Sequence, residues 1–389
     1  MNAVRLLERD SSSSLALRFR PSRREARPHV PVRRYKRVLV DRRTKYINRT
    51  KPNGVKVISA SQPTDAVLLA RAHLSLVAGS CVGEQADLTA LSALVAEVGP
   101  IEASNRISSG DFVFASKNAM SGGGAVGLAR RHLEEIGRCG GRLVVPEDAE
   151  WPGERLAPPS EGGRRDRGSG EPLALWVRGP HCLSEFLGKA VAVTGARAAS
   201  PYGVQVASEF GSDLAANGVT VVAGGAYGID EAAHRGALTT DGRTVAVLPC
   251  GVDVAYPVGN SVLLERISRE GLLISEYSPG VVPARQRFLA RNRIVAACSD
   301  GLVVVEAGRR SGTSYTARIT AVLGRVVMAV PGPITSATSV GCLELMRDGR
   351  AIPVGSTEDI LKALQSRTDG VGGNRTMPAS QAVRPEAAS

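Results

Sequence analysis

A turn of small residues that carries one arginine follows an apolar run in the second half of the chain. The turn is Gly195-Ala196-Arg197; it follows Ala190–Thr194 and is followed by Ser200-Pro201. Small residues let the backbone approach a ligand, a helix that begins here offers unpaired N–H groups, and a guanidinium presents a fork of donors. The turn therefore suits a phosphate group. The alternative is a tight turn whose arginine pairs with a nearby carboxylate, and the turn alone favours neither.

A second turn, Gly224-Gly225-Ala226-Tyr227-Gly228, follows the apolar run Thr220–Ala223 and again permits close backbone approach. Asp230 and His234 come next, four residues apart and so on one helix face. A catalytic acid–base pair is conceivable, but we favour a structural pair because no nucleophile stands beside it. Cys250 is interpreted as a small buried residue, since its local sequence holds no cue for a lowered thiol pKa.

Two further segments add basic and hydroxyl side chains. Arg291 and Arg293 point about 200° apart on a helix, so one can face a ligand while the other pairs inside the protein. Ser311-Gly312-Thr313 opens another predicted helix and makes a second anion cradle. The candidate phosphate-binding residues are Gly195, Ala196, Arg197, Gly224, Gly225, Tyr227, Gly228, Arg291, Asn292, Arg293, Ser311, Gly312, Thr313 and Thr316.

Alternating strands and helices must position these turns. Most of the apolar runs after residue 189 lack polar alternation, which indicates strands buried on both faces of a parallel sheet. Such sheets bind ligands at the carboxyl ends of their strands, where all of these turns lie. We predict an α/β fold, Rossmann-like and doubly wound, with a mostly parallel sheet. The predicted strands are 190–194, 220–223, 244–248, 272–275, 302–305, 326–330 and 351–354; the predicted helices are 202–216, 229–239, 260–269, 289–298, 313–323 and 341–347.

The sequence before this region predicts a different organisation. Helical periodicity over 66–77, 87–98 and 124–138 indicates a small helical domain over residues 63–140. Short strands at 143–146 and 173–177 lead into the Rossmann-like domain, which we therefore extend over 141–366. A literal G-x-G-x-x-G at 122–127 lacks a surrounding βαβ unit, so we interpret it as a linker.

The positive charge is concentrated at the N-terminus. Residues 1–60 hold 17 Lys/Arg and 4 Asp/Glu, whereas the whole chain has a net charge of +12, so the remainder is close to neutral. A basic tail binds nucleic acid without specificity, and specific binding by the core must come from locally clustered arginines. Low aromatic content, 4%, argues against base stacking as the main ligand contact. We predict that residues 1–62 and 367–389 are disordered.

Cysteine usage and hydropathy limit the location of the protein. The six cysteines are scattered and form no C-x-x-C motif, which favours small core residues of a reducing compartment over disulfides or zinc ligands. No apolar run reaches membrane-span length, and the N-terminus lacks the apolar region of a secretory signal. We therefore expect a cytoplasmic protein with no bound metal.

The ordered set of turns resembles the DprA (Smf) family of DNA-processing proteins. No single motif is specific for the family, but the order of the motifs over residues 173–361 is. The segment 64–138 looks like the family's small, SAM/HhH-like helical domain. The matching residues are Val193–Arg197, Gly224–Asp230 with His234, Tyr256-Pro257, Ser275-Glu276-Tyr277, Arg291-Asn292-Arg293, Val305-Glu306-Ala307, Ser311-Gly312-Thr313 with Thr316-Ala317, and Val330-Pro331-Gly332.

The resemblance implies a homodimeric, single-stranded DNA-binding recombination mediator that loads the recombinase RecA on incoming DNA during natural transformation. It implies no established catalysis and no cofactor, and it makes Arg197 a DNA contact. Tyr227 stands where many members have Lys or Arg, although a tyrosine can stack on a base. Leu289 replaces a usual proline, and we expect no winged-helix module after residue 366.

Two enzyme classes share this kind of sheet. A LOG-type phosphoribohydrolase needs an acidic residue after its glycine-threonine pair, but Ser314-Tyr315-Thr316 follows Gly312-Thr313 here. A dinucleotide oxidoreductase needs a ribose-binding Asp or Glu near the end of the second strand, where Gly224-Gly225 stands. Both are disfavoured, and nucleotide binding or hydrolysis remains the alternative function.

Overall fold

The computed structural model describes residues 63–81, 83–114, 123–156, 171–240, 242–309 and 311–368. The predictions for residues 1–62 and 369–389 lie outside them. The predicted C-terminal tail begins inside a helix, because α12, which the sequence patterns did not predict, runs over Thr357–Thr368. The predicted domain boundaries stay predictions.

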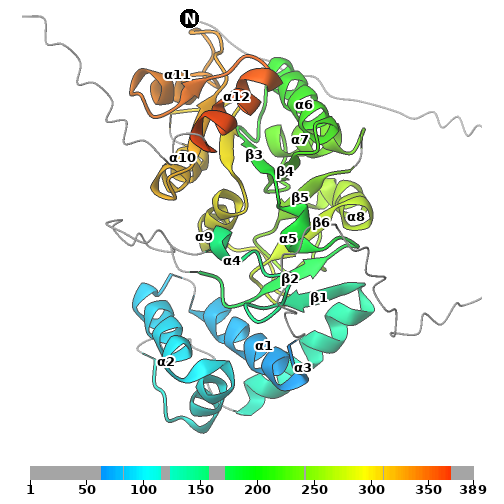
Figure 1. Ribbon diagram of the computed structural model, residues 1–389, viewed down its shortest axis with the longest axis vertical. Coiled ribbons are helices and arrows are strands. Elements are labelled where there is room, and N and C mark those ends of the chain that lie inside the picture. The colour runs from blue at the N-terminus through cyan, green and yellow to red at the C-terminus, as the bar shows by residue number, and fades with distance from the viewer. Residues whose placement is uncertain are drawn as a thin grey trace, which may run out of the picture. The chain divides into compact units, whose positions relative to one another are not determined.

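A nine-stranded sheet with the order β1-β2-β6-β5-β4-β3-β7-β8-β9 organises the chain from residue 141 onward (Figure 1). Strands β3 to β9 pair in parallel, and β1 and β2 join antiparallel beside β6. The prediction of a mostly parallel α/β sheet is therefore confirmed. The strands are β1 Gly141–Val144, β2 Leu175–Arg178, β3 Ala190–Thr194, β4 Thr220–Ala223, β5 Thr244–Val247, β6 Leu272–Ser275, β7 Gly301–Val304, β8 Val326–Ala329 and β9 Ile352–Pro353.

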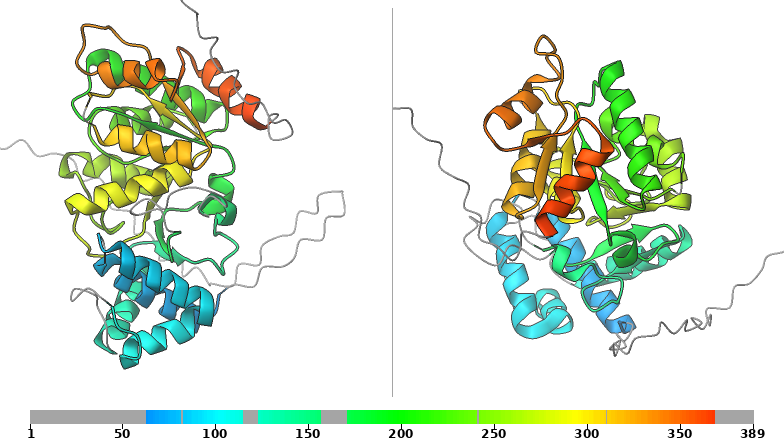
Figure 2. Two further views of the ribbon diagram at one scale, coloured as in Figure 1. Left: turned by 90° about the vertical axis from the view of Figure 1, so that its left-hand side faces the viewer. Right: turned by 45° about the horizontal axis from the view of Figure 1, so that its top comes forward.

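Each central strand is apolar throughout because it faces two cores. In β3, Ala190 and Ala192 pack into one core, while Val191 and Val193 pack into the other. Helices α6, α7, α8 and α12 cover one face, and α9, α10 and α11 cover the other, so the fold is doubly wound (Figure 2). Their bounds are α6 Pro201–Ala216, α7 Ile229–Ala237, α8 Ser261–Glu270, α9 Arg285–Ala297, α10 Gly312–Val322 and α11 Val340–Arg347.

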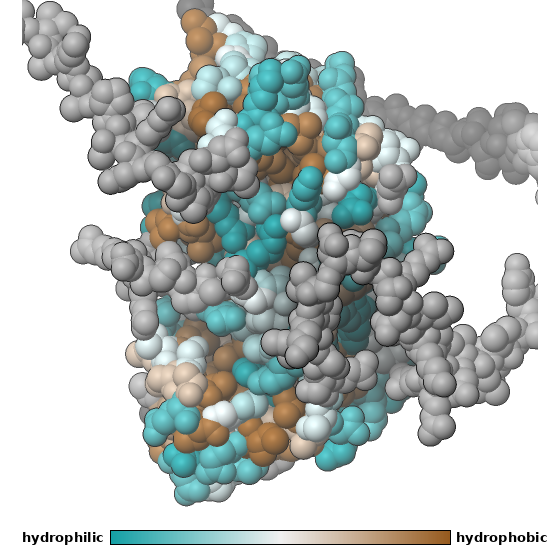
Figure 3. All heavy atoms as spheres, viewed as in Figure 1, coloured by the Kyte–Doolittle hydropathy of each residue, from teal (hydrophilic) through white to brown (hydrophobic). Residues whose placement is uncertain are grey.

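Three helices precede the sheet; the third packs against β1, and the first contacts β2. Their bounds are α1 Asp65–Ser80, α2 Gln85–Ser109 and α3 Gly123–Arg138, and α2 bends at Gly99-Pro100. The indole of Trp176 in β2 donates a 3.1 Å hydrogen bond to Ser75 in α1. No helix of the described ranges is long and apolar enough to cross a bilayer. Figure 3 shows apolar residues in small groups among polar ones on the face it presents.

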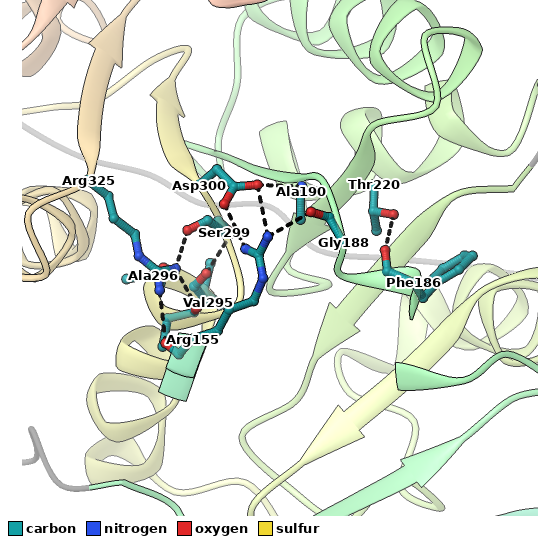
Figure 4. Close-up of polar contacts among 11 residues, drawn as sticks. Arg155, Phe186, Gly188, Ala190, Thr220, Val295, Ala296, Ser299, Asp300 and Arg325 are labelled. Carbon is teal, nitrogen blue, oxygen red and sulfur yellow. Dashed lines mark hydrogen bonds and ion pairs between the residues drawn. The ribbon is translucent and has the colours of Figure 1, made fainter. Parts of the chain in front are cut away.

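Two arginines fix the amino-terminal edge of the sheet (Figure 4). Arg155, in the short helix α4 (Gly153–Leu156), forms a 2.8 Å ion pair with Asp300, whose carboxylate also accepts from the backbone of Ala190 at the start of β3. Arg325 donates to the carbonyls of Ala296 and Ala297, the last residues of α9, and of Ser299, which follows its C-cap. Since a helix leaves its last carbonyls unpaired, Arg325 anchors one end of α9 and so positions its other end.

We expect Arg325→Ala to lower the free energy of unfolding by about 1–3 kcal/mol, because it leaves several carbonyls at the end of α9 without their charged donor. Urea denaturation of the full chain measures this. The matched control is Arg347→Ala, whose side chain is 71% exposed and, among the described residues, pairs with Asp348 alone. It should change stability by no more than about 0.5 kcal/mol. Equal effects of the two substitutions would show that Arg325 does not anchor α9.

Candidate functional site

The loops that follow β3, β4, β5 and β7 meet at the carboxyl edge of the sheet. The strand order reverses between β3 and β7, and this switch point is where open α/β sheets receive ligands. Asp230, in the first turn of α7, ties two of these loops together. It accepts 2.9 Å hydrogen bonds from the hydroxyl of Thr194 and from the backbone of Gly224. Burial raises the pKa of Asp230, and the nearby guanidinium of Arg291 opposes that rise.

Arg291 lies under the glycine-rich turn after β4 rather than at the surface. Its side chain is buried, and Nη1 donates a 2.5 Å hydrogen bond to the carbonyl of Val247 at the end of β5. A Cβ on Gly224 would lie 1.9 Å from that Nη1. The glycine at position 224 therefore makes room for the protein's own guanidinium, and not for a ligand.

Arg293 is also engaged inside the protein. It forms a 2.5 Å ion pair with Glu276, and the two side chains are 14% and 15% exposed. Arg291 and Arg293 thus both have partners inside the protein, and contact of either one with a ligand stays a prediction. Asn292, between them, is half-buried.

Arg197, in contrast, is exposed. Its guanidinium carbon lies 5.1 Å from the ring centroid of Phe288, whose ring meets that of Tyr256 edge-to-face at 5.6 Å. Within the described part of the chain, no carboxylate forms an ion pair with Arg197. The sequence patterns did not single out Phe288. The helix α9 begins at Arg285, before the predicted start at residue 289, and this places Phe288 in its first turn.

The turn after β4 supports the turn that holds Arg197. Gly228 has a φ of +77°, and a Cβ there would lie 2.4 Å from the carbonyl oxygen of Ala196. The next residue, Ile229, donates its backbone N–H to the same carbonyl at 3.2 Å. Tyr227 is 45% exposed, and its hydroxyl accepts a 3.1 Å hydrogen bond from the backbone of Gly259. Its ring is thus held at the surface.

The start of α6 is already occupied by an anionic group of the protein. Ser200 is the N-cap, and its backbone N–H and hydroxyl donate to the carboxylate of Glu306 at 2.9 and 2.6 Å. The hydroxyl of Thr338 donates to the same carboxylate at 2.9 Å, and Glu306 is 2% exposed. The sequence predicted that this helix start offers unpaired N–H groups to a phosphate, and the structure corrects that prediction. Gly195 adjoins the backbone of Glu306, since a Cβ there would lie 2.6 Å from its carbonyl oxygen.

The start of α10 has fewer internal partners. Ser311 occupies its N-cap position without a side-chain capping bond, and its buried hydroxyl has no hydrogen-bond partner among the described residues. Gly312 is exposed, whereas Thr313 and Thr316 are buried and the hydroxyl of Thr316 donates to the carbonyl of Gly312 at 3.3 Å. Ser311 and Gly312 therefore remain the candidate phosphate-binding residues of this second predicted turn.

His234 and Cys250 have the properties of core residues. The ring Nδ1 of His234 lies 2.7 Å from the hydroxyl of Thr244, which itself donates to the carbonyl of Val221, so Nδ1 carries the proton. Burial lowers the pKa of His234 to about 3, and Arg291 adds to this effect. Burial also raises the pKa of the Cys250 thiol to about 12. His234 bonds to Thr244 rather than to Asp230, so the predicted Asp–His pair is not formed.

Comparisons with known proteins give a consistent result. A family model described as DNA recombination-mediator protein A matches residues 142–365. The putative DNA processing protein DprA of Mycobacterium tuberculosis (strain CDC 1551 / Oshkosh) is 49% identical over 273 residues, which are 70% of each chain. DNA processing protein DprA of Streptococcus pneumoniae (strain R6) is 40% identical over 190 residues, 49% of this chain and 66% of that protein. The X-ray structure of DprA from Streptococcus pneumoniae matches with a TM-score of 0.57 and 27% identity, covering 78% of this chain and 98% of that one.

We expect Gly224→Ala to destabilise the protein by about 3 kcal/mol or more, because the new methyl group displaces the buried guanidinium of Arg291 from its partners. Denaturant titration measures the effect. Gly137→Ala is the matched control, since a Cβ there meets nothing within 4 Å and the residue lies in α3. The control should be neutral or stabilising by up to about 1 kcal/mol. A neutral Gly224→Ala would mean that Arg291 does not need this space.

Proposed function

Because this chain belongs to the DNA recombination-mediator protein A family, we propose that it binds single-stranded DNA along the carboxyl edge of its sheet. Its curated relatives are named DNA processing proteins, which supports a DNA-processing role. The observation that carries the proposal is the exposed guanidinium of Arg197 on the ring of Phe288. An arginine stacked on an aromatic ring keeps its N–H donors free for a phosphate.

Further basic side chains lie on the same helix as Phe288. Arg285 is exposed in the first turn of α9. Arg287 stacks over Tyr277, with its guanidinium carbon 5.2 Å from the ring centroid, and donates to the carbonyl of Val282. With Arg197 they make a local positive cluster on a core whose net charge is close to zero, which is what attraction of a polyanion requires.

Exposed aromatic rings favour a single strand over a duplex. Tyr227 is 45% exposed and Phe288 is half-buried, and both flank the turn that carries Arg197. Unpaired bases present faces that stack on such rings, whereas a duplex hides them. The two rings suffice for one or two bases, so phosphate contacts carry most of the affinity. The proposed contact residues are Ala196, Arg197, Tyr227, Asn292, Ser311 and Gly312 from the sequence patterns, with Arg285 and Phe288 added.

The family resemblance also suggests what the protein does with the DNA that it binds. We propose that the protein acts as a recombination mediator that loads RecA on incoming single-stranded DNA in natural transformation. In this role it works in the cytoplasm as a homodimer, without catalysis, a cofactor or a metal. The buried, neutral forms of His234 and Cys250 support a non-catalytic role for the edge of the sheet.

We expect Arg197→Ala to weaken binding of fluorescent oligo-dT by about tenfold, the loss of one charged hydrogen bond to a phosphate. The slope of log K against log salt should fall by about 0.7, because one fewer counterion is released from a single strand. Fluorescence anisotropy with the full chain at several salt concentrations measures both quantities.

The control for this experiment is Arg269→Ala, which removes the same charge from the last turn of α8. That side chain is 73% exposed and pairs with Glu265 on its own helix. The control should keep wild-type affinity. If Arg197→Ala binds oligo-dT as tightly as the control does, with the same salt slope, the proposed interface is refuted.

A further inference from the structure

We infer that Glu306 is a specificity-determining residue whose carboxylate takes the place of a nucleotide phosphate at the start of α6 and so keeps free nucleotides out of the switch point. Glu306 follows β7, and α6 follows β3, the two strands between which the order reverses. In sheets of this type the phosphate of a bound nucleotide lies at the helix start beside that point. The inference concerns exclusion of nucleotides and does not rest on the proposed binding of DNA.

The hydrogen bonds to Glu306 are those expected for a bound phosphate. A backbone N–H and a hydroxyl from Ser200 reach the carboxylate, and the hydroxyl of Thr338 completes the set. These donors come from the loop after β3 and from the loop after β8. Three converging donors at a helix start are a phosphate-binding arrangement, and here a side chain of the protein satisfies it.

The space at this helix start is also filled. Gly203 lies in the first turn of α6, and a Cβ there would lie 2.4 Å from Oε2 of Glu306. The missing side chain at position 203 therefore accommodates the carboxylate itself. Because Glu306 is 2% exposed, a second anion could enter only by displacing it.

Electrostatics acts in the same direction as the packing. The positive end of the α6 dipole already faces a carboxylate, so its attraction for a further anion is reduced. A phosphate placed next to Glu306 would meet a like charge in a region of low dielectric. Phosphates are thus left to the exposed side of the edge, where Arg197 lies. A free nucleotide gains little from a single exposed cation, whereas a polymer contacts several basic residues at once.

Glu306→Ala in the full chain tests the inference with inorganic phosphate and AMP as probes. Isothermal titration calorimetry should show that the variant binds both at least about tenfold more tightly than the wild-type chain. Glu306→Gln should gain less affinity than Glu306→Ala, because the amide still fills the space although it no longer carries the charge. Glu344→Ala, which removes a carboxylate that pairs with Arg309 on the surface, controls for the change in net charge and should gain no affinity.

The outcome separates this inference from the proposed function. Cooperative thermal unfolding first verifies that Glu306→Ala is folded, and Glu306→Ser replaces it if it is not. A folded variant with no gain in affinity for phosphate or AMP would overturn the inference, as would wild-type protein that already binds AMP as tightly as the variant. The proposed function is tested separately, by oligo-dT binding of the wild-type chain and of Arg197→Ala. The affinity of Glu306→Ala for oligo-dT does not decide the inference, because Glu306 holds Ser200, which follows Arg197 in the same loop.

Discussion

The buried carboxylate of Glu306 is the constraint on which the carboxyl edge of this sheet depends. It joins the end of β7 to the N-cap of α6 through Ser200 and to the loop after β8 through Thr338. A buried charge is tolerated only when it is well hydrogen-bonded, and here three donors meet that requirement. Because these donors are used internally, ligand contacts at the switch point are left to the residues around them.

A second buried charge, of opposite sign, sets the other side of the edge. The guanidinium of Arg291 lies beneath Gly224 and donates a hydrogen bond to the end of β5. It also interacts electrostatically with the carboxylate of Asp230. Asp230 in turn holds the loops after β3 and β4. Glu306, Arg291 and Asp230 thus connect the loops after β3, β4, β7 and β8 with the end of β5. The exposed Arg197, on the ring of Phe288, remains outside this internal network.

The sheet could be predicted from sequence because burial on both faces leaves a local pattern. Val191 and Val193 face one core and Ala192 faces the other, so the whole run is apolar and its neighbours in sequence suffice to identify it. The partners of the charged residues leave no such local pattern. Ser200 and Glu306 are 106 positions apart, and Arg291 reaches a carbonyl 44 positions away. Arg197 could therefore be identified as a candidate from its local turn, whereas the internal contacts of Arg291, Arg293 and Gly224 could not be predicted because their partners are distant in sequence.

The central claim is that single-stranded DNA contacts the exposed Arg197 and Phe288 while Glu306 keeps its place. A crystal structure of the full chain with oligo-dT tests this most directly. The account predicts a phosphate within hydrogen-bond distance of the Arg197 guanidinium, a base against Phe288, and unchanged hydrogen bonds between Glu306 and Ser200. A strand that lies on another face of the protein, or a phosphate that displaces Glu306 from the start of α6, would contradict it.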